Sequence, residues 1–246
     1  MKCRRCETEN AGGMKFCGEC GAPLALPPTW SATPDTDLDR PGAGGGAPQG
    51  ERKLVTVLFA DVAGFTTLAE TLDPEPLRDL INACFDRLVP CVERYGGTVD
   101  KFIGDEIMAL FGAPVAHEND AERAVRAALD MREALVDFNA ERGTDLRAHF
   151  GINTGLVLAA AVGASGRSDY SVMGDAVNVA ARLAEAAAPG EILVGPDTGR
   201  STSHLFEFAS GADVPVRGRS EPVTTYRLRG LQKTAQSRAP MSHGIR

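Results

Sequence analysis

The hydrophobic and polar positions divide the middle of the chain into helical and extended segments. Apolar side chains recur every three or four residues from 74 to 95 and from 120 to 141, the rhythm of a helix with one buried face. Short apolar runs predict strands at residues 54–60, 98–102, 107–111, 147–153 and 155–162. The order strand, helix, strand, strand, helix, strand is the ferredoxin-like βαββαβ arrangement of an α+β fold.

Smaller elements follow this core. An alanine-rich helix is predicted at residues 174–188, where Pro189 and Gly190 stop it. Further short strands are expected at residues 191–194, 206–208, 212–216 and 225–228. We therefore expect one globular domain over residues 51–230.

The segments on either side of this domain differ from it in composition. Residues 26–50 are rich in proline and glycine and hold few large apolar side chains, so burial cannot offset the entropy lost on ordering. We expect a flexible linker there. Residues 231–246 are polar and aperiodic, which indicates a tail or a linker into a further domain, as in a fragment of a longer protein.

The overall composition is that of a globular protein and argues against a membrane-spanning or nucleic-acid-binding one. Of the 246 residues, 43% are hydrophobic, which is enough for a core, and the net charge of −7 argues against nonspecific binding to nucleic acid. No apolar run approaches the roughly 18 residues that a transmembrane helix requires. The basic N-terminus lacks the apolar core of a signal peptide. We expect a cytoplasmic protein with no membrane or nucleic-acid partner.

Four of the six cysteines form two CxxC pairs separated by ten residues: Cys3, Cys6, Cys17 and Cys20. Two such turns can close a tetrahedral four-thiolate site, so we expect a zinc ribbon over residues 1–25 with one structural Zn²⁺. The alternative is a pair of disulfides in a secreted miniprotein. A closed site of this kind is structural, and the ribbon could bind a partner not identified by the sequence or merely cap the chain. Cys84 and Cys91 fit buried apolar positions better than ligands.

Two aspartates occupy the ends of predicted strands. Asp61 follows an apolar run, and Asp105 lies at the tip of the predicted hairpin, four residues after Lys101. The ferredoxin-like topology places the first strand beside the hairpin, so the two carboxylates should converge at one sheet edge. Carboxylate oxygens favour Mg²⁺ or Mn²⁺, and the pattern predicts a site for divalent metal and polyphosphate. The neighbouring Glu106 is expected to point to the opposite side of the hairpin.

These aspartates belong to ordered motifs that resemble a known family. The motifs are Phe59–Phe65 (FADVAGF), Lys101–Asp105 (KFIGD), Gly151–Gly155 (GINTG) and Gly174–Arg182 (GDAVNVAAR). Together they resemble the catalytic domain of class III nucleotidyl cyclases over about residues 51–230. The resemblance implies the palm fold of that family and a homodimer with shared active sites, which converts ATP to 3′,5′-cyclic AMP and pyrophosphate. The order of ribbon, linker and cyclase also resembles bacterial signalling proteins in which an ATPase domain follows.

The resemblance also implies roles for residues that contact metal and phosphate. Asp61, Asp105 and the backbone carbonyl of Val62 match the ligands of two Mg²⁺ or Mn²⁺ ions. The turn of Gly64, Phe65 and Thr66 enters a short helix at residues 65–72, whose free amide groups can cradle phosphate. The terminal phosphates would meet a basic residue, for which Arg217 is the candidate and Arg219 the alternative.

The remaining implied residues read the base and complete catalysis. Lys101 matches the position that donates to adenine N1, and Ser171 matches the second base-reading position, usually aspartate or threonine. A hydroxyl both donates and accepts, so Ser171 discriminates adenine from guanine less than aspartate would. On the alanine-rich helix, Asn178 would orient the ribose and Arg182 would stabilise charge on the α-phosphoryl oxygens. The resemblance implies that both act on nucleotide bound chiefly by the other protomer.

Two other functions remain open at this point. A catalytically silent nucleotide-sensing module would keep the fold without making product, although such modules usually lose a metal aspartate or the Asn/Arg pair, and all are present here. Guanylyl cyclase activity is the other alternative, because of Ser171. A diguanylate cyclase is disfavoured, since its Gly-Gly-Asp/Glu-Glu-Phe turn is absent.

Overall fold

The computed structural model describes residues 8–9, 50–63, 72–164, 167–216 and 219–232, and nearly all of them belong to a compact unit spanning Gly46–Arg246. These ranges leave out all of the predicted zinc ribbon except residues 8–9, most of the predicted linker and tail, and most of the helix predicted at 65–72. No helix within the described ranges combines the length and the apolar character needed to cross a bilayer.

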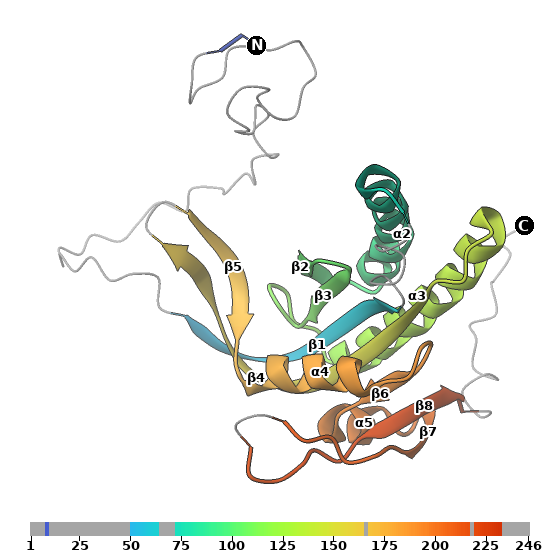
Figure 1. The fold of residues 1–246 in the computed structure, drawn as a ribbon. Coiled ribbons are helices and arrows are strands. Elements are labelled where there is room, and N and C mark those ends of the chain that lie inside the picture. Colours follow the sequence, from blue (N-terminus) through green and yellow to red (C-terminus); the bar gives the residue numbers. More distant parts are fainter. Residues whose placement is uncertain (1–7, 10–49, 64–71, 165–166, 217–218, 233–246) are drawn as a thin grey trace, which may run out of the picture. The chain divides into compact units, whose positions relative to one another are not determined.

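Four strands form the centre of the sheet, in the order β2 (Thr98–Ile103), β3 (Glu106–Phe111), β1 (Glu51–Ala63) and β4 (Arg147–Ala164). Each pairs antiparallel with its neighbour. Two helices, α2 (Pro74–Arg94) and α3 (Asp120–Arg142), provide the crossovers between β1 and β2 and between β3 and β4. This topology confirms the predicted ferredoxin-like core (Figure 1).

Further elements extend the sheet beyond β4. A short β6 (Ile192–Val194) pairs parallel with β4, and β8 (Tyr226–Leu231) and β7 (Phe206–Ser210) follow it outward. The strand β5 (Arg167–Met173) folds back on the far half of β4 as a hairpin. Two helices complete this part, α4 (Asp175–Ala186) and the short α5 (Pro196–Thr202).

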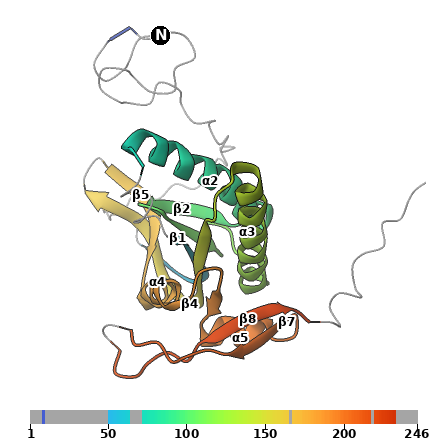
Figure 2. The same ribbon diagram turned by 45° about the vertical axis from the view of Figure 1, so that its right-hand side comes forward.

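The alternation of side chains along β1 explains why helices cover both faces of the sheet. Leu58, Ala60 and Val62 belong to a core that contains the buried faces of α2 and α3. Val55, Val57 and Phe59, whose side chains point to the other face, belong to a second core under α4. Figures 1 and 2 show α2 and α3 together on one side of the sheet and α4 on the other. The same strand thus holds two separate hydrophobic cores together.

Two glycines of β4 allow α4 to lie directly on the strand. A Cβ atom added at Gly151 would lie 2.1 Å from the Ala180 carbonyl oxygen, and one added at Gly155 would lie 2.9 Å from the Ala176 Cβ. The sequence pattern predicts a break near Gly155, but β4 is continuous. Gly155 marks a close approach of a helix and not the end of a strand.

Three smaller elements also differ from the prediction. β5 and α5 were not predicted, because Arg167–Met173 is largely polar and Pro196–Thr202 is too short for a helical stripe. Conversely, the strand predicted at residues 212–216 is a single bridge between Val214 and Val223. These segments are held by their neighbours in the fold, a tertiary effect that local patterns do not carry.

Candidate active site

The end of β1 and the β2–β3 turn bring acidic residues together at one sheet edge. Asp61 lies directly opposite Glu106 in the β1–β3 ladder, and Asp105 occupies the turn just before Glu106. The backbone N–H of Val62 donates to the carbonyl oxygen of Asp105 at 3.3 Å. Asp61 and Asp105 therefore lie close together, as the topology predicted.

The electrostatics of this edge favour a bound cation. Burial raises the pKa of Asp105, a backbone hydrogen bond opposes the rise, and the nearby Asp61 carboxylate adds to it. Burial also raises the pKa of Glu106 to about 7, with further contributions from Asp61, Glu185 and Asp105. Because Glu106 faces Asp61 across the ladder, the expectation that it points to the opposite side is wrong.

The donor set fits a hard divalent cation that also binds substrate. Within the described ranges, no group of three or more His, Cys, Asp or Glu side chains is arranged to hold a metal ion by itself. Mg²⁺, however, is commonly held by one or two carboxylates, with substrate phosphates and water filling the octahedron. Asp61 and Asp105 supply such a pair, and a cation would relieve their mutual repulsion. Gly64, Phe65 and Thr66 lie outside the described residues.

Lys101 and Ser171, 70 residues apart in sequence, meet across the fold. The Lys101 Nζ donates to the Ser171 Oγ at 3.0 Å, which joins β2 to β5. The structure adds a third residue, Asp100, whose Oδ2 accepts from the Ser171 Oγ at 2.9 Å and lies 3.0 Å from the Lys101 Nζ. The Asp100 side chain is 2% exposed, whereas that of Lys101 is 45% exposed.

Sequence reasoning missed Asp100 for a geometric reason. Consecutive side chains of a regular strand point to opposite faces, so Asp100 and Lys101 should not share a partner. A β-bulge in β2 shifts the register between Val99 and Lys101, which lets both side chains reach Ser171. No local pattern in the sequence signals this bulge.

On α4, Asn178 and Arg182 lie one turn apart and line a cavity of about 230 Å³. Ala181, Glu185 and Val216 line it with them. The Arg182 guanidinium pairs with the Glu185 carboxylate on the same helix. Since Glu185 also acts on the pKa of Glu106, this face of α4 lies within electrostatic range of the acidic edge.

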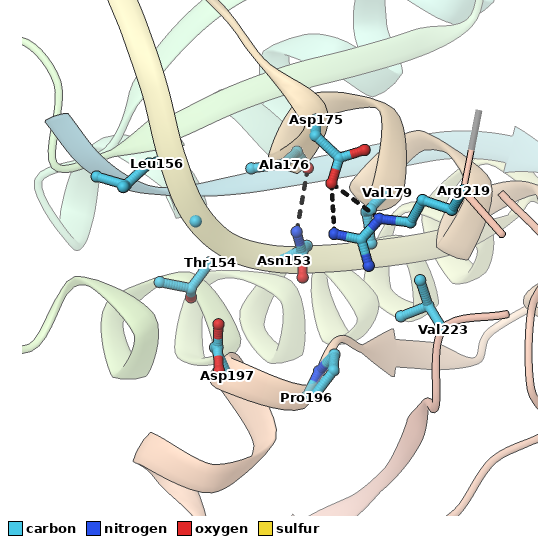
Figure 3. A pocket seen from close by; sticks show the side chains of 11 residues that line it. Asn153, Thr154, Leu156, Asp175, Ala176, Val179, Pro196, Asp197, Arg219 and Val223 are labelled. Atoms are coloured by element: carbon cyan, nitrogen blue, oxygen red, sulfur yellow. Dashed lines mark hydrogen bonds and ion pairs between the residues drawn. The ribbon is translucent and has the colours of Figure 1, made fainter. Parts of the chain in front are cut away.

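Arg219, the alternative candidate for the phosphate contact, is held at the start of α4. Its Nε donates to the Asp175 Oδ2 at 2.9 Å at the margin of a cavity of about 310 Å³ (Figure 3). The helix is capped by Gly174 with no side-chain cap, so Asp175 engages Arg219 and does not cap the helix. In the same cavity the Asn153 Nδ2 donates to the Ala176 carbonyl oxygen at 3.2 Å. Arg217, the first candidate, lies outside the described residues.

Comparison with known proteins places this geometry in a family. The sequence model of the adenylate and guanylate cyclase catalytic domain matches residues 48–230. The chain belongs to this family. Its nucleotidyl cyclase domain therefore contains the acidic edge, the Lys101–Ser171 contact and the Asn178–Arg182 face.

Solved structures support the assignment of the cyclase domain. The adenylyl cyclase CyaB from P. aeruginosa is 35% identical, with a TM-score of 0.70, over 75% of this chain and 98% of that chain. The guanylyl cyclase Cya2 is 32% identical, with a TM-score of 0.71, over 75% of this chain and 96% of that chain. The fold is thus shared by cyclases of both purine specificities.

A curated relative matches a shorter segment of the cyclase domain more closely. Adenylate cyclase 1 of Rhizobium meliloti (strain 1021) is 42% identical over 136 residues, which are 54% of this chain and 20% of the relative. The chain spans about a fifth to a third of the length of the curated relatives that it matches, with coverage from 20% to 35%.

Proposed function

We propose that this cyclase domain is an adenylyl cyclase, which converts ATP to 3′,5′-cyclic AMP and pyrophosphate at sites shared by two copies of the chain. The observation that carries the proposal is the 3.0 Å contact between Lys101 and Ser171, the two base-reading positions. The similarity to CyaB and to the Rhizobium adenylate cyclase supports the same substrate.

The preference for adenine follows from the donors that each purine presents. Adenine N1 accepts a hydrogen bond and its 6-amino group donates, whereas guanine N1 carries a proton and its O6 accepts. The Lys101 ammonium only donates, so it suits adenine N1 and opposes the N1–H of guanine. Ser171 can accept from the 6-amino group.

Asp61, Asp105 and the backbone carbonyl of Val62 would hold two Mg²⁺ or Mn²⁺ ions together with the triphosphate. Such ions supply activation of the 3′-oxygen and neutralisation of the leaving pyrophosphate. The turn of Gly64, Phe65 and Thr66 would bind phosphate through its amide groups.

Residues from the second copy would complete each site. Asn178 would orient the ribose, and Arg182 would exchange its Glu185 partner for the α-phosphoryl oxygens as their charge develops. Arg217 would contact the terminal phosphates. Arg219, which is engaged by Asp175, suits that role less.

An apolar sheet surface supports association of two copies. Leu54 lies opposite Leu156 on β1 and β4, and Leu158 lies opposite Met173 on β4 and β5. These four side chains are between 39% and 66% exposed and lie on one face of three adjacent strands. A continuous apolar surface of this kind is typical of a protein interface, and the family forms dimers.

For the regions outside the described residues, we propose the organisation that the sequence predicts. Cys3, Cys6, Cys17 and Cys20 would bind one structural Zn²⁺ in a ribbon over residues 1–25, with a partner or a capping role. Residues 26–50 would form the linker to a catalytic domain at 51–230. Residues 231–246 would form the tail or the linker to a further domain.

Guanylyl cyclase activity is the second candidate, favoured by the hydroxyl at Ser171 and by the similarity to Cya2. One experiment decides between the two. Purified protein is incubated with Mn²⁺ and either ATP or GTP, and the cyclic product is identified by mass. We expect cyclic AMP. Cyclic GMP alone would favour the second candidate, and nucleotide binding without product would indicate a silent sensing module.

A further inference from the structure

We propose that Asp100 is a positioning residue for base selection, which acts through Ser171 and makes its hydroxyl group an obligate hydrogen-bond acceptor. This inference rests on the proposed role of Lys101 and Ser171 in reading the purine. It assigns a function to a buried carboxylate that is not itself expected to contact the nucleotide.

The hydrogen bonds among Asp100, Lys101 and Ser171 determine which donors and acceptors remain for a ligand. A serine hydroxyl has one proton and two lone pairs. The proton of Ser171 is donated to the Asp100 Oδ2 at 2.9 Å, and one lone pair accepts from the Lys101 Nζ at 3.0 Å. The second lone pair is the only hydrogen-bonding capacity that Ser171 has left for a ligand.

The Lys101 ammonium group also keeps hydrogen-bonding capacity for a ligand. The Lys101 Nζ donates one of its three protons to Ser171 and forms an ion pair with the Asp100 Oδ2, at 3.0 Å each. At least one proton remains for a ligand. Together, Lys101 and Ser171 offer one donor and one acceptor, which matches N1 and the 6-amino group of adenine and mismatches both positions of guanine.

Burial separates the role of Asp100 from that of Lys101, whereas Ser171 is itself only 5% exposed. Its side chain is 2% exposed, while that of Lys101 is 45% exposed. A nucleotide can therefore reach Lys101 directly but meets Asp100 only through its effect on the other two side chains. The β-bulge between Val99 and Lys101 makes this arrangement available, because a regular strand would turn Asp100 to the other face.

Asp100 thus accounts for adenine selectivity in a site that has serine at the second base-reading position. An isolated hydroxyl could rotate and donate to guanine O6. With its proton committed to a carboxylate, the hydroxyl presents the acceptor that an aspartate would otherwise supply.

The test is a double-mutant comparison on the full chain. Asp100→Ala, Ser171→Ala and the double variant are assayed for kcat/KM with ATP and GTP and for binding of 3′-deoxy-ATP and 3′-deoxy-GTP, which cannot cyclise. Asp100→Ala should lower the ATP-to-GTP ratio of kcat/KM about tenfold, since it removes the acceptor of the Ser171 proton and the hydroxyl can then donate to a ligand. Added to Ser171→Ala, the same substitution should leave the ratio unchanged.

Asp130→Ala is the matched control. Asp130 also accepts from a cation and a hydroxyl, the Arg94 Nη1 at 2.8 Å and the Tyr95 hydroxyl at 3.1 Å, but between α3 and the C-terminal end of α2. It should not change the purine ratio. An unchanged ratio in Asp100→Ala would overturn the inference, and so would an equal shift with and without the Ser171 hydroxyl.

The outcomes separate this inference from the proposed function. If the wild-type protein makes no cyclic nucleotide, the cyclase proposal fails, and the ratio of binding constants for the deoxy analogues decides the role of Asp100. If Asp100→Ala does not fold, the wild-type protein and Ser171→Ala are compared with ATP and purine riboside triphosphate, which lacks the 6-amino group. The wild-type protein should prefer ATP about tenfold and Ser171→Ala should not. Equal kcat/KM values for the two nucleotides in the wild-type protein would show that Ser171 does not accept from the 6-amino group.

Discussion

The backbone N–H of Val62 donates to the carbonyl oxygen of Asp105 at 3.3 Å, which ties the end of β1 to the β2–β3 turn. Because Asp61 immediately precedes Val62, this bond holds two carboxylates of distant sequence position at one sheet edge. The hydrogen bond belongs to the backbone, so it persists when either side chain is changed. The edge can therefore be probed by substitution without dismantling it.

Replacement of Asp61 or Asp105 by Asn should lower cyclic AMP formation by at least about 100-fold, since each carboxylate is a proposed metal ligand. The unfolding temperature in chelator should stay the same or rise, because one of two neighbouring negative charges is removed. Activity with Mn²⁺ and thermal unfolding are the measurements. Asp86→Asn on the exposed side of α2 is the control, and an active Asp61→Asn protein would rule out the metal role.

Shared sites predict complementation between inactive variants. An Asp61→Ala protein mixed with an Asn178→Ala protein should recover about a quarter of wild-type activity, because half of the dimers are mixed and each holds one intact site of two. The measurement is cyclic AMP formation after subunit exchange, confirmed by two affinity tags. Absence of recovery despite exchange would argue for sites within single chains.

The apolar surface on β1, β4 and β5 should be required for association. Leu156 is 66% exposed, and Leu156→Glu should weaken the dimer at least about tenfold, since a charge would be buried at the interface. Val136 on α3 is similarly exposed, at 65%, and lies away from this surface. Sedimentation of Val136→Glu should therefore match the wild-type protein. Equal dimerisation of both variants would place the interface elsewhere.

The cysteines should divide into two classes by reactivity. Burial raises the pKa of Cys84 to about 11 and also raises that of Cys91, so at pH 8 only about 0.1% of Cys84 is thiolate. Both should resist iodoacetamide in the folded protein with or without zinc, and the Cys84 thiolate fraction should rise only as the pH approaches 11. Cys3, Cys6, Cys17 and Cys20 should become reactive when zinc is removed. Peptide mass spectrometry measures each site, and labelling of the four cysteines in zinc-loaded protein would contradict a zinc ribbon.

The parts of the fold that local patterns specify were predicted closely. The amphipathic stripe of α2 was predicted at residues 74–95 and the helix spans Pro74–Arg94, because its periodic apolar face faces the core. The proximity of Asp61 and Asp105 followed from topology, since the sequence order places the first strand beside the hairpin.

What the sequence could not specify depends on contacts between distant segments. Arg167–Met173 is mostly polar, and it forms β5 because β4 supplies a partner along its whole length. Asp100 was missed because its orientation depends on a register shift in β2, which leaves no periodic signal. Glu106 was assigned to the wrong side because its partner is set by the β1–β3 register. The zinc ribbon lies outside the described residues and stays a prediction.

The glycine at position 151 has a mechanical consequence. A methyl group there would collide with the Ala180 carbonyl oxygen and, at 2.3 Å, with the Ala184 nitrogen, so α4 rests on bare strand backbone. Because α4 already contacts the backbone of β4, it cannot move or tilt closer to the sheet. The Asn178 amide and the Arg182 guanidinium therefore cannot come closer to β4 by movement of the helix, and in the proposed dimer their closer approach to a nucleotide bound by the other copy would come from rotation of one copy against the other.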